Sequence, residues 1–203
     1  MTFRRISLIA AAALVFSALA VGVARAQDGR TISDFSLKSP SNATVTLSSY
    51  AKNKAVVVVF VNPNCAFSKL YQSRLNALNA AYSGRGVQFL FINTPINLEA
   101  TADAADTEKM KVKTTGADDY PYLTDESQKV SALLGATKTP EAVVLEPSGT
   151  GFVVRYKGAI DDNAQVEAYA KDKYLAQALD NVLAGRPVGT TERRAAGCLI
   201  KKP

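Results

Sequence analysis

The sequence predicts an α/β fold in which a mixed central β-sheet is flanked by helices on both faces. Strand and helix patterns alternate through the first part of the chain, which favours parallel strands joined by crossover helices. Two strand patterns separated by a tight turn follow, and such strands pair antiparallel. The chain has one-domain size and can bury a core without needing disulfides.

The period of the apolar residues predicts each element. A continuous apolar run rich in β-branched residues predicts a strand buried on both faces, and apolar residues at helical spacing predict an amphipathic helix. Glycine and proline mark the ends. In the first half of the chain we expect a hairpin over 35–47, a strand over 55–61, a helix over 66–82 and a strand over 87–92. Residues 98–112 form either an exposed helix or a solvated spacer, and we favour the spacer. In the second half we expect an extended piece at 122–123, a helix over 127–134, strands over 142–146 and 152–156, and a long amphipathic helix over 164–183.

The N-terminus has the pattern of a secretory signal peptide. Arg4 and Arg5 precede an apolar stretch over 6–23, and Ala24-Arg25-Ala26 matches an A-x-A cleavage site. We therefore expect an exported protein, periplasmic or extracellular, that is cut after Ala26. The alternative is an uncleaved membrane anchor, because the stretch is close to the length that spans a bilayer.

The rest of the chain reads as one domain followed by a tail. The sequence predicts a signal peptide over 1–26, a single domain over 27–187 and a C-terminal tail over 188–203, which has no hydrophobic period. Cys198 lies in this tail. We expect the tail to be mobile enough to bring that cysteine back to the domain.

Composition excludes several classes of function. The net charge of +6 falls to +3 once the three arginines of the signal are removed, and this mild excess argues against a nucleic-acid partner. Histidine is absent, which excludes a Ser-His-Asp triad, a Cys-His protease pair and the usual histidine-based zinc and copper sites. We expect no metal site and no cofactor. The acidic pair Asp161-Asp162 is best explained as the N-cap of the helix over 164–183.

Cys65 is the most informative residue. It lies where the strand over 55–61 becomes the helix over 66–82, after the turn formed by Pro63 and Asn64. The helix dipole and the N–H groups at a helix start favour the thiolate, which is the reactive form of cysteine. The alternative is a small buried hydrophobic residue, since free cysteine is often buried.

The order of these features resembles the thioredoxin fold. A strand, a turn, a cysteine and a helix are followed later by Thr139-Pro140 before a hairpin. The N-terminal hairpin and the insertion between Pro95 and Tyr120 resemble the redoxin branch, which includes the alkyl hydroperoxide reductase and thiol-specific antioxidant proteins. The resemblance implies a cis Thr139-Pro140 peptide facing Cys65, and the alternative is an ordinary trans proline.

The motif departs from both parent families. Cys65-Ala66-Phe67-Ser68 gives C-x-x-S, so the resolving cysteine of thioredoxins is replaced by a serine that cannot form a disulfide. Asn62 stands where peroxiredoxins carry a threonine. Arg74 or Arg155 could approach the thiolate, although spacing alone does not place them there.

The second cysteine leaves three possibilities open. Gly197-Cys198-Leu199-Ile200, together with Lys69-Leu70-Tyr71, resembles a subset of uncharacterised bacterial exported redoxins. Cys198 could resolve an intermediate on Cys65 by thiol–disulfide exchange. It could instead form a static bridge, worth about 4–5 kcal/mol in the chain-entropy model. The third possibility is two unpaired thiols.

Taken with the resemblance, these residues predict an exported thiol–disulfide oxidoreductase or thiol-dependent peroxide reductase. Cys65 would attack and Cys198 would be the candidate resolving cysteine. The partners implied are a thiol or disulfide protein, or a peroxide, with an external dithiol reductant, and a membrane only if the signal is uncleaved. The alternative is a redox-inert binding module with a structural Cys65–Cys198 disulfide. The residues expected to shape the site are Pro63, Asn64, Phe67, Ser68, Thr139 and Pro140.

Overall fold

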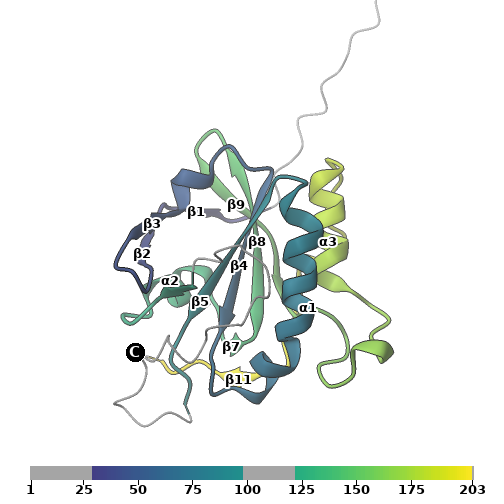
Figure 1. Ribbon diagram of the computed structural model, residues 1–203. Coiled ribbons are helices and arrows are strands. Elements are labelled where there is room, and N and C mark those ends of the chain that lie inside the picture. The colour runs from purple at the N-terminus through teal and green to yellow at the C-terminus, as the bar shows by residue number, and fades with distance from the viewer. Residues whose placement is uncertain (1–28, 98–121, 203) are drawn as a thin grey trace, which may run out of the picture.

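The computed structural model describes residues 29–97 and 122–202 (Figure 1). The expected signal peptide and the expected helix or spacer over 98–112 lie outside these residues. The elements, in order, are β1 (Thr31–Ile32), β2 (Ser36–Lys38), β3 (Thr44–Thr46), η1 (Leu47–Tyr50), β4 (Ala55–Val61), α1 (Ala66–Ser83), β5 (Val87–Asn93), β6 (Tyr122–Thr124), α2 (Lys129–Leu134), β7 (Lys138–Thr139), β8 (Glu141–Ser148), β9 (Gly151–Gly158), η3 (Glu167–Tyr169), α3 (Tyr174–Leu183), β10 (Glu192–Arg193) and β11 (Cys198–Leu199).

The central sheet is mixed, as the sequence predicts. Its strand order is β1-β9-β8-β4-β5-β6-β2-β3, with β10 added to β9. The pairs β4–β5 and β5–β6 are parallel, while β4–β8 and β8–β9 are antiparallel. The predicted N-terminal hairpin is formed by β2 and β3, which pair Leu37 with Val45.

Strand β4 is buried on both faces because each face is covered by its own layer. Val57, Val59 and Val61 pack in the core cluster that includes α1 and α3, and the alternate residues pack in the cluster that includes α2 and the N-terminal hairpin. Figure 1 shows α1 and α3 side by side on one face of the sheet, with α2 on the other. No helix within 29–97 or 122–202 is both long and apolar enough to cross a bilayer.

The last helix is shorter than predicted. The sequence predicts a helix over 164–183, but α3 begins at Tyr174, and the preceding residues form a loop with one 3-10 turn. Asn163 does make bonds of the kind that cap a helix, since its Oδ1 accepts the N–H groups of Gln165 and Val166, but only the short 3-10 turn follows them. The apolar stripe of this segment is also not buried, since Tyr169 is 70% exposed.

The tail packs onto the domain through two short strands, which its sequence did not predict. Strand β10 runs parallel to β9, and β11 pairs antiparallel with β7. The tail backbone comes very close to β9 at Gly158, which has φ +138°. A Cβ added to Gly158 would lie 1.8 Å from the Arg193 carbonyl oxygen. Only glycine allows the tail to lie this close to β9.

We predict that Gly158→Ala lowers the free energy of unfolding by about 2 kcal/mol or more, because the added Cβ meets the Arg193 carbonyl and an L side chain is strained at this φ. Chemical denaturation of the oxidised protein measures the change. Gly149→Ala is the matched control, since a Cβ there has no heavy atom within 4 Å. Equal losses in the two variants would contradict this account of the tail.

Candidate functional site

Cys65 is the N-cap residue of α1 and is completely buried. Asn62, at the end of β4, organises the turn that places it there. The Asn62 carbonyl accepts the Cys65 N–H at 3.1 Å, and its side-chain Oδ1 accepts the Asn64 N–H at 2.8 Å. A buried strand therefore turns directly into a helix, with the sulfur at the positive end of the helix dipole.

Ser68 has a structural contact that explains the C-x-x-S pattern. The side chain is buried, and its Oγ accepts the N–H of Asn62 at 3.2 Å. The hydroxyl thus ties the first turn of α1 to the end of β4. Ser68 therefore supports the turn around Cys65, in place of the disulfide-forming cysteine of a C-x-x-C motif.

Cys65 and Cys198 are joined in a disulfide across 133 residues of sequence, with their Cα atoms 5.9 Å apart. This separation is within the ordinary range for disulfides. The expectation of two unpaired thiols is therefore wrong. The two expectations that remain are a redox-active pair and a static bridge.

The Thr139-Pro140 peptide is cis, as the resemblance implies. Cys65 Sγ lies 3.1 Å from the Thr139 carbonyl oxygen. A sulfur in a disulfide carries no hydrogen, but the reduced Cys65 thiol can donate its S–H to this carbonyl. Thr139 pairs with Cys198 in the β7–β11 ladder, so the Thr139 backbone contacts both sulfur-bearing residues.

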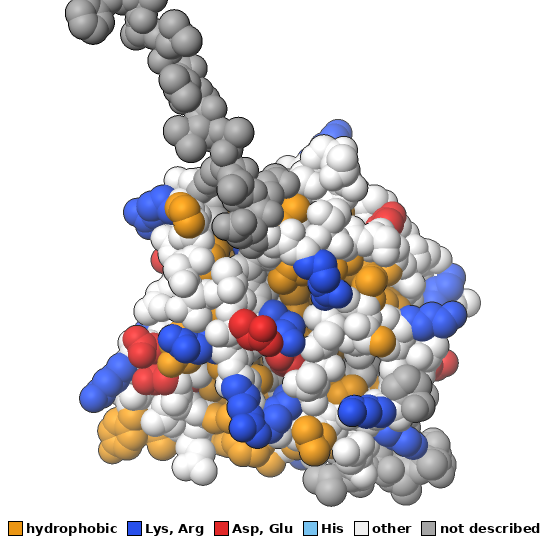
Figure 2. Space-filling view, turned by 180° about the vertical axis from the view of Figure 1, so that it is seen from behind, with side chains coloured by type: hydrophobic (Ala, Val, Ile, Leu, Met, Phe, Trp, Pro, Cys, Tyr) orange, Lys and Arg blue, Asp and Glu red, His pale blue; other side chains and the backbone are white. Residues whose placement is uncertain are grey.

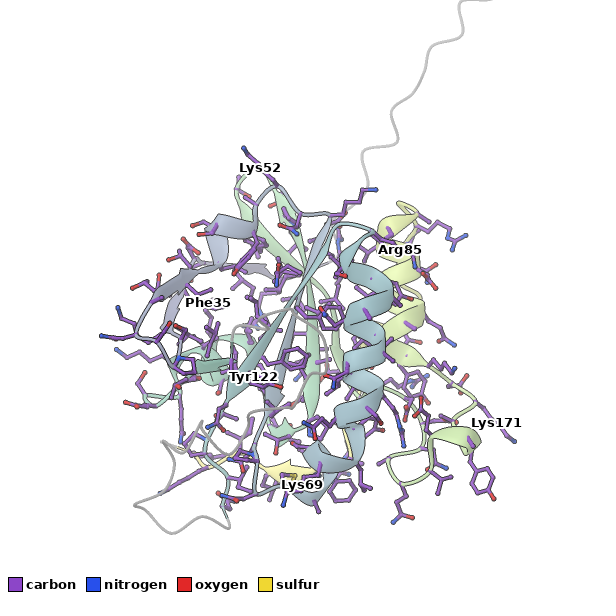
Figure 3. All side chains as sticks on the ribbon, viewed as in Figure 1. Phe35, Lys52, Lys69, Arg85, Tyr122 and Lys171 are labelled. Carbon is purple, nitrogen blue, oxygen red and sulfur yellow. A yellow bond between two sulfur atoms is a disulfide. The ribbon has the colours of Figure 1, made fainter. Side chains whose placement is uncertain are left out.

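The tail strand lies between two walls of backbone. On one side, the Ile200 N–H donates to the Thr137 carbonyl at 3.0 Å. On the other side, the Asn97 N–H donates to the Leu199 carbonyl at 3.1 Å, and the Lys201 N–H donates to the Pro95 carbonyl at 2.9 Å. We call the space between 95–97 and 137–139 the tail groove. Figures 1 and 3 show β11 crossing at the N-terminal end of α1.

Glu141 fixes one wall of the tail groove. Its buried carboxylate Oε2 accepts the N–H of Thr137 at 2.6 Å and the N–H of Lys138 at 3.1 Å. The N–H groups of Thr137 and Lys138 therefore donate their hydrogen bonds to a side chain and not to a neighbouring strand. The segment before Pro140 is held extended, with the Thr137 carbonyl bonded to the tail.

The other predicted site residues differ in their exposure. Pro63 and Phe67 are half-buried and Asn64 is exposed, while Pro140 is buried. Lys69 is exposed one turn into α1 (Figure 3).

Neither arginine considered for orienting a peroxide has its bonding directed to Cys65. Arg74 Nη1 donates to Asp161 Oδ2 at 2.8 Å and to the Asn163 carbonyl. It lies nine residues along α1 from Cys65, about 13 Å along the axis. Arg155 pairs with Glu146, about 20 Å along β8 and β9 from Thr139.

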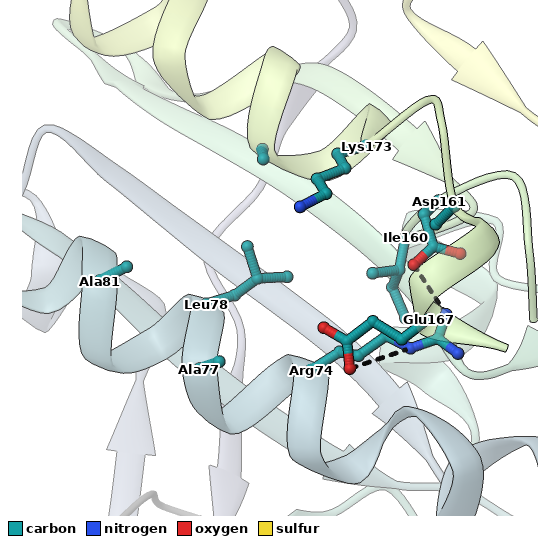
Figure 4. A pocket seen from close by; sticks show the side chains of 10 residues that line it. Arg74, Ala77, Leu78, Ala81, Ile160, Asp161, Glu167 and Lys173 are labelled. Atoms are coloured by element: carbon teal, nitrogen blue, oxygen red, sulfur yellow. Dashed lines mark hydrogen bonds and ion pairs between the residues drawn. The ribbon is translucent and has the colours of Figure 1, made fainter.

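Arg74 instead lines a cavity of about 180 Å³ between α1 and the loop before α3 (Figure 4). Asp161 accepts bonds there from Arg74 and from the Tyr71 hydroxyl at 2.6 Å, and Glu167 lies 3.8 Å from Arg74 Nε. Asp161 is therefore not the N-cap of a following helix, as the sequence suggested, but the buried partner that ties α1 to this loop.

Charges of both signs lie on the surface of the protein. Lysine and arginine side chains are interspersed with acidic ones on the face shown in Figure 2. Within 29–97 and 122–202, no group of three histidine, cysteine, aspartate or glutamate side chains is placed to hold a metal ion. The chemistry that the described site offers is that of its two sulfurs.

Comparison with known proteins agrees with this geometry. The model of the AhpC/TSA family matches residues 29–168. The chain belongs to the AhpC/TSA family. It is therefore a redoxin with a thioredoxin-like fold, as the resemblance implied. None of the curated proteins compared with the chain matches it.

Three solved structures illustrate the likeness. A hypothetical protein from Sinorhizobium meliloti 1021 is 30% identical, with a TM-score of 0.70, and the match covers 86% of this chain and 94% of that one. An uncharacterized conserved protein from Geobacillus kaustophilus is 27% identical, with a TM-score of 0.69 and coverage of 86% and 92%. A candidate thiol:disulfide interchange protein DsbE from Chlorobium tepidum is 19% identical, with a TM-score of 0.56 and coverage of 76% and 96%, which shows a shared fold alone.

Sequence reasoning missed four residues that build the redoxin site. Asparagine before proline is a turn signal, but that signal does not show which backbone groups Asn62 bonds. An acid in an apolar strand directly after Thr-Pro could have drawn attention to Glu141. Gly197 lies directly against the Thr139 carbonyl, and Ile96 forms a bridge with Ile200 of the tail. These contacts join segments that are distant in sequence, and no local pattern reveals them.

We predict that Asp161→Asn lowers the free energy of unfolding by about 3–5 kcal/mol, because it leaves the buried Arg74 guanidinium without its main partner. Asp180→Asn is the matched control. Its ion pair with Arg85 is about half exposed on both sides and is worth about 0–1 kcal/mol. Denaturant titration at neutral pH measures both, and similar losses in the two variants would count against the assigned role of Asp161.

A pH dependence follows from the same cluster. Burial, followed by the hydrogen bond to Asp161 and its charge, raises the pKa of the Tyr71 phenol above its ordinary value. The folded state therefore favours the neutral phenol, so this stabilisation is present below about pH 10 and is lost as pH rises further. Tyr71→Phe should flatten the fall in unfolding free energy above about pH 10, and an unchanged slope would disprove the link.

Proposed function

We propose that this redoxin is a thiol–disulfide oxidoreductase in which Cys65 attacks the partner's disulfide and Cys198 resolves the mixed disulfide. One observation carries the proposal. The Cys65–Cys198 disulfide joins a buried sulfur at a helix N-terminus to a sulfur on a partly exposed strand. Cys65 is the good leaving group of this pair, because its thiolate is stabilised at the helix start, and Cys198 is the accessible sulfur. Thiol–disulfide exchange requires both properties.

Exchange with a partner proceeds in two steps. The reduced Cys65 thiolate attacks one sulfur of the partner disulfide, forming a Cys65–partner bond and expelling the other partner sulfur as a thiolate, which takes up a proton. The Cys198 thiolate then attacks Cys65 Sγ, forming the Cys65–Cys198 disulfide and releasing the second partner thiol. The partner's disulfide is reduced by two electrons, and the redoxin's dithiol is oxidised by two.

An external dithiol reductant completes the cycle, and the burial of the two sulfurs decides where it enters. Cys65 is fully buried, whereas Cys198 is partly exposed. The reductant's thiolate therefore attacks Cys198 and expels Cys65, whose thiolate is stabilised at the start of α1. Its second thiol then displaces Cys198. We expect a reductant with one thiol to be trapped on Cys198.

The geometry favours disulfide exchange over peroxide reduction. A peroxidase site needs a fixed cation to orient the peroxide beside the thiolate. Arg74 and Arg155 are held by acidic partners elsewhere in the fold. The group beside Cys65 Sγ is the Thr139 carbonyl, a neutral acceptor that supplies no positive charge for the oxygen leaving a peroxide.

The setting of this activity is part of the same proposal. The signal-like N-terminus, Arg4 to Ala26, supports an exported protein that works after cleavage in the periplasm or outside the cell. Disulfides form and persist in such compartments. The partner is then an exported protein that carries a disulfide.

The test is turnover with a limiting dithiol reductant and insulin as the disulfide substrate. We expect the wild-type chain to turn over repeatedly. Cys198→Ser should stop after one equivalent, with a mixed disulfide on Cys65 visible by mass spectrometry, because the resolving thiolate is missing. Cys65→Ser should show no reaction above the uncatalysed rate.

Two outcomes would overturn the proposal. If Cys198→Ser turns over like the wild type, Cys198 is not the resolving cysteine. If neither the wild type nor any variant reacts, while both cysteine variants lose a similar few kcal/mol of unfolding free energy, the disulfide is a structural bridge in a binding module.

A further inference from the structure

A partner that forms a disulfide with Cys65 must enter the tail groove. Cys65 has no exposed surface while β11 is in place. The covalent approach to its sulfur is the one that Cys198 occupies, with the two Cα atoms 5.9 Å apart. A partner cysteine bonded to Cys65 therefore takes the position of Cys198, and the residues on either side of it take the positions of the tail.

The tail groove selects an extended backbone. Its walls bond the tail from both sides, through Thr137 on one and through Pro95 and Asn97 on the other. A helical or looped segment cannot satisfy two facing rows of backbone groups, whereas an extended strand can. The partner segment thus lies as β11 does, antiparallel to β7.

The position before the cysteine accepts only glycine. A Cβ built on Gly197 would lie 2.1 Å from the Thr139 carbonyl oxygen and 2.7 Å from its carbonyl carbon. Both atoms belong to the backbone, in a segment that Glu141 holds in place. The wall therefore cannot move aside for a larger residue.

The positions after the cysteine alternate. Leu199 is 54% exposed, while Ile200 is only 8% exposed and packs in the core cluster on the α2 side of the sheet. Ile200 also bridges to Ile96 of the facing wall. The groove thus leaves the first position after the cysteine free and buries an aliphatic side chain at the second.

We propose that the tail groove is the binding site for an extended Gly-Cys-x-aliphatic segment of the partner. The tail residues Gly197–Ile200 show how such a segment lies in the groove, and they compete with it for the same position. This inference rests on the proposed exchange activity. It adds the partner's sequence preference, and it makes displacement of β11 a required step before Cys65 reacts.

Peptides copied from the tail test the sequence preference. The probe is Ala-Gly-Cys-Leu-Ile-Lys with its cysteine joined to a chromogenic aromatic thiol. Cys65 of the reduced full-length Cys198→Ser chain attacks the peptide sulfur, forming a Cys65–peptide disulfide and expelling the aromatic thiolate, which is the better leaving group. The release is followed by absorbance.

Three altered peptides separate the positions. Replacing glycine by valine, or isoleucine by asparagine, should slow the reaction at least about tenfold, because the first clashes with the wall and the second leaves the buried aliphatic position unfilled. Replacing leucine by asparagine is the matched control and should change the rate by no more than about twofold. Asparagine is used because it adds no charge near the thiolate.

Variants of the tail test the competition. In the Cys198→Ser background, Ile200→Asn should speed the reaction with the parent peptide about tenfold, because the tail then vacates the groove more often. Leu199→Asn is the matched control, since that side chain is exposed, and should leave the rate within about twofold. The peptide series uses only the Cys198→Ser chain, so it stands even if Ile200→Asn does not fold.

The outcomes separate the two proposals. If Cys65 does not react even with a small aromatic disulfide, the exchange activity itself is wrong. If it reacts with that disulfide, but the four peptides react at equal rates or Ile200→Asn brings no acceleration, the activity stands and the assigned groove preference is overturned.

Discussion

The pairing of the tail with the backbone beside Cys65 is the contact on which the site depends. It combines a covalent bond, backbone hydrogen bonds to walls on both sides, and the burial of Ile200. Because this strand covers Cys65, the exchange proposed here requires that part of the contact first be broken or displaced. Reduction removes the covalent bond but leaves the hydrogen bonds and the buried side chain in place.

The strength of each pattern decides how much the sequence predicts. Strand β4 and helix α1 were predicted almost to the residue, because a doubly buried strand and a long amphipathic helix have strong periods. These two elements fix Cys65 at a helix start, so the central part of the site follows from local sequence. The cis peptide at Thr139-Pro140 came from family resemblance and not from any period.

The parts that sequence reasoning did not predict are set by contacts between distant segments. Strands β10 and β11 are two residues each and form only because β9 and β7 offer partners. The first half of the predicted helix over 164–183 is a loop with one 3-10 turn, in which Glu167 lies beside the buried Arg74 and Tyr169 is exposed. A local apolar period cannot show whether a surface exists to bury it.

The tail is attached to the domain at two places, β10 and β11, and only β11 carries Cys198. Strand β10 is bonded to β9 through Lys157 and Ala159, and Arg193 lies over the Tyr174 ring, so this attachment does not use the disulfide. When β11 leaves the groove, Cys198 stays on the segment after Arg193, which reaches on the order of 17 Å when extended. A short tether keeps the effective concentration of its thiolate at Cys65 near millimolar or above. In the proposed exchange, resolution by Cys198 would therefore outpace attack by a dilute external thiol, while the short reach would still allow a partner strand to occupy the groove first.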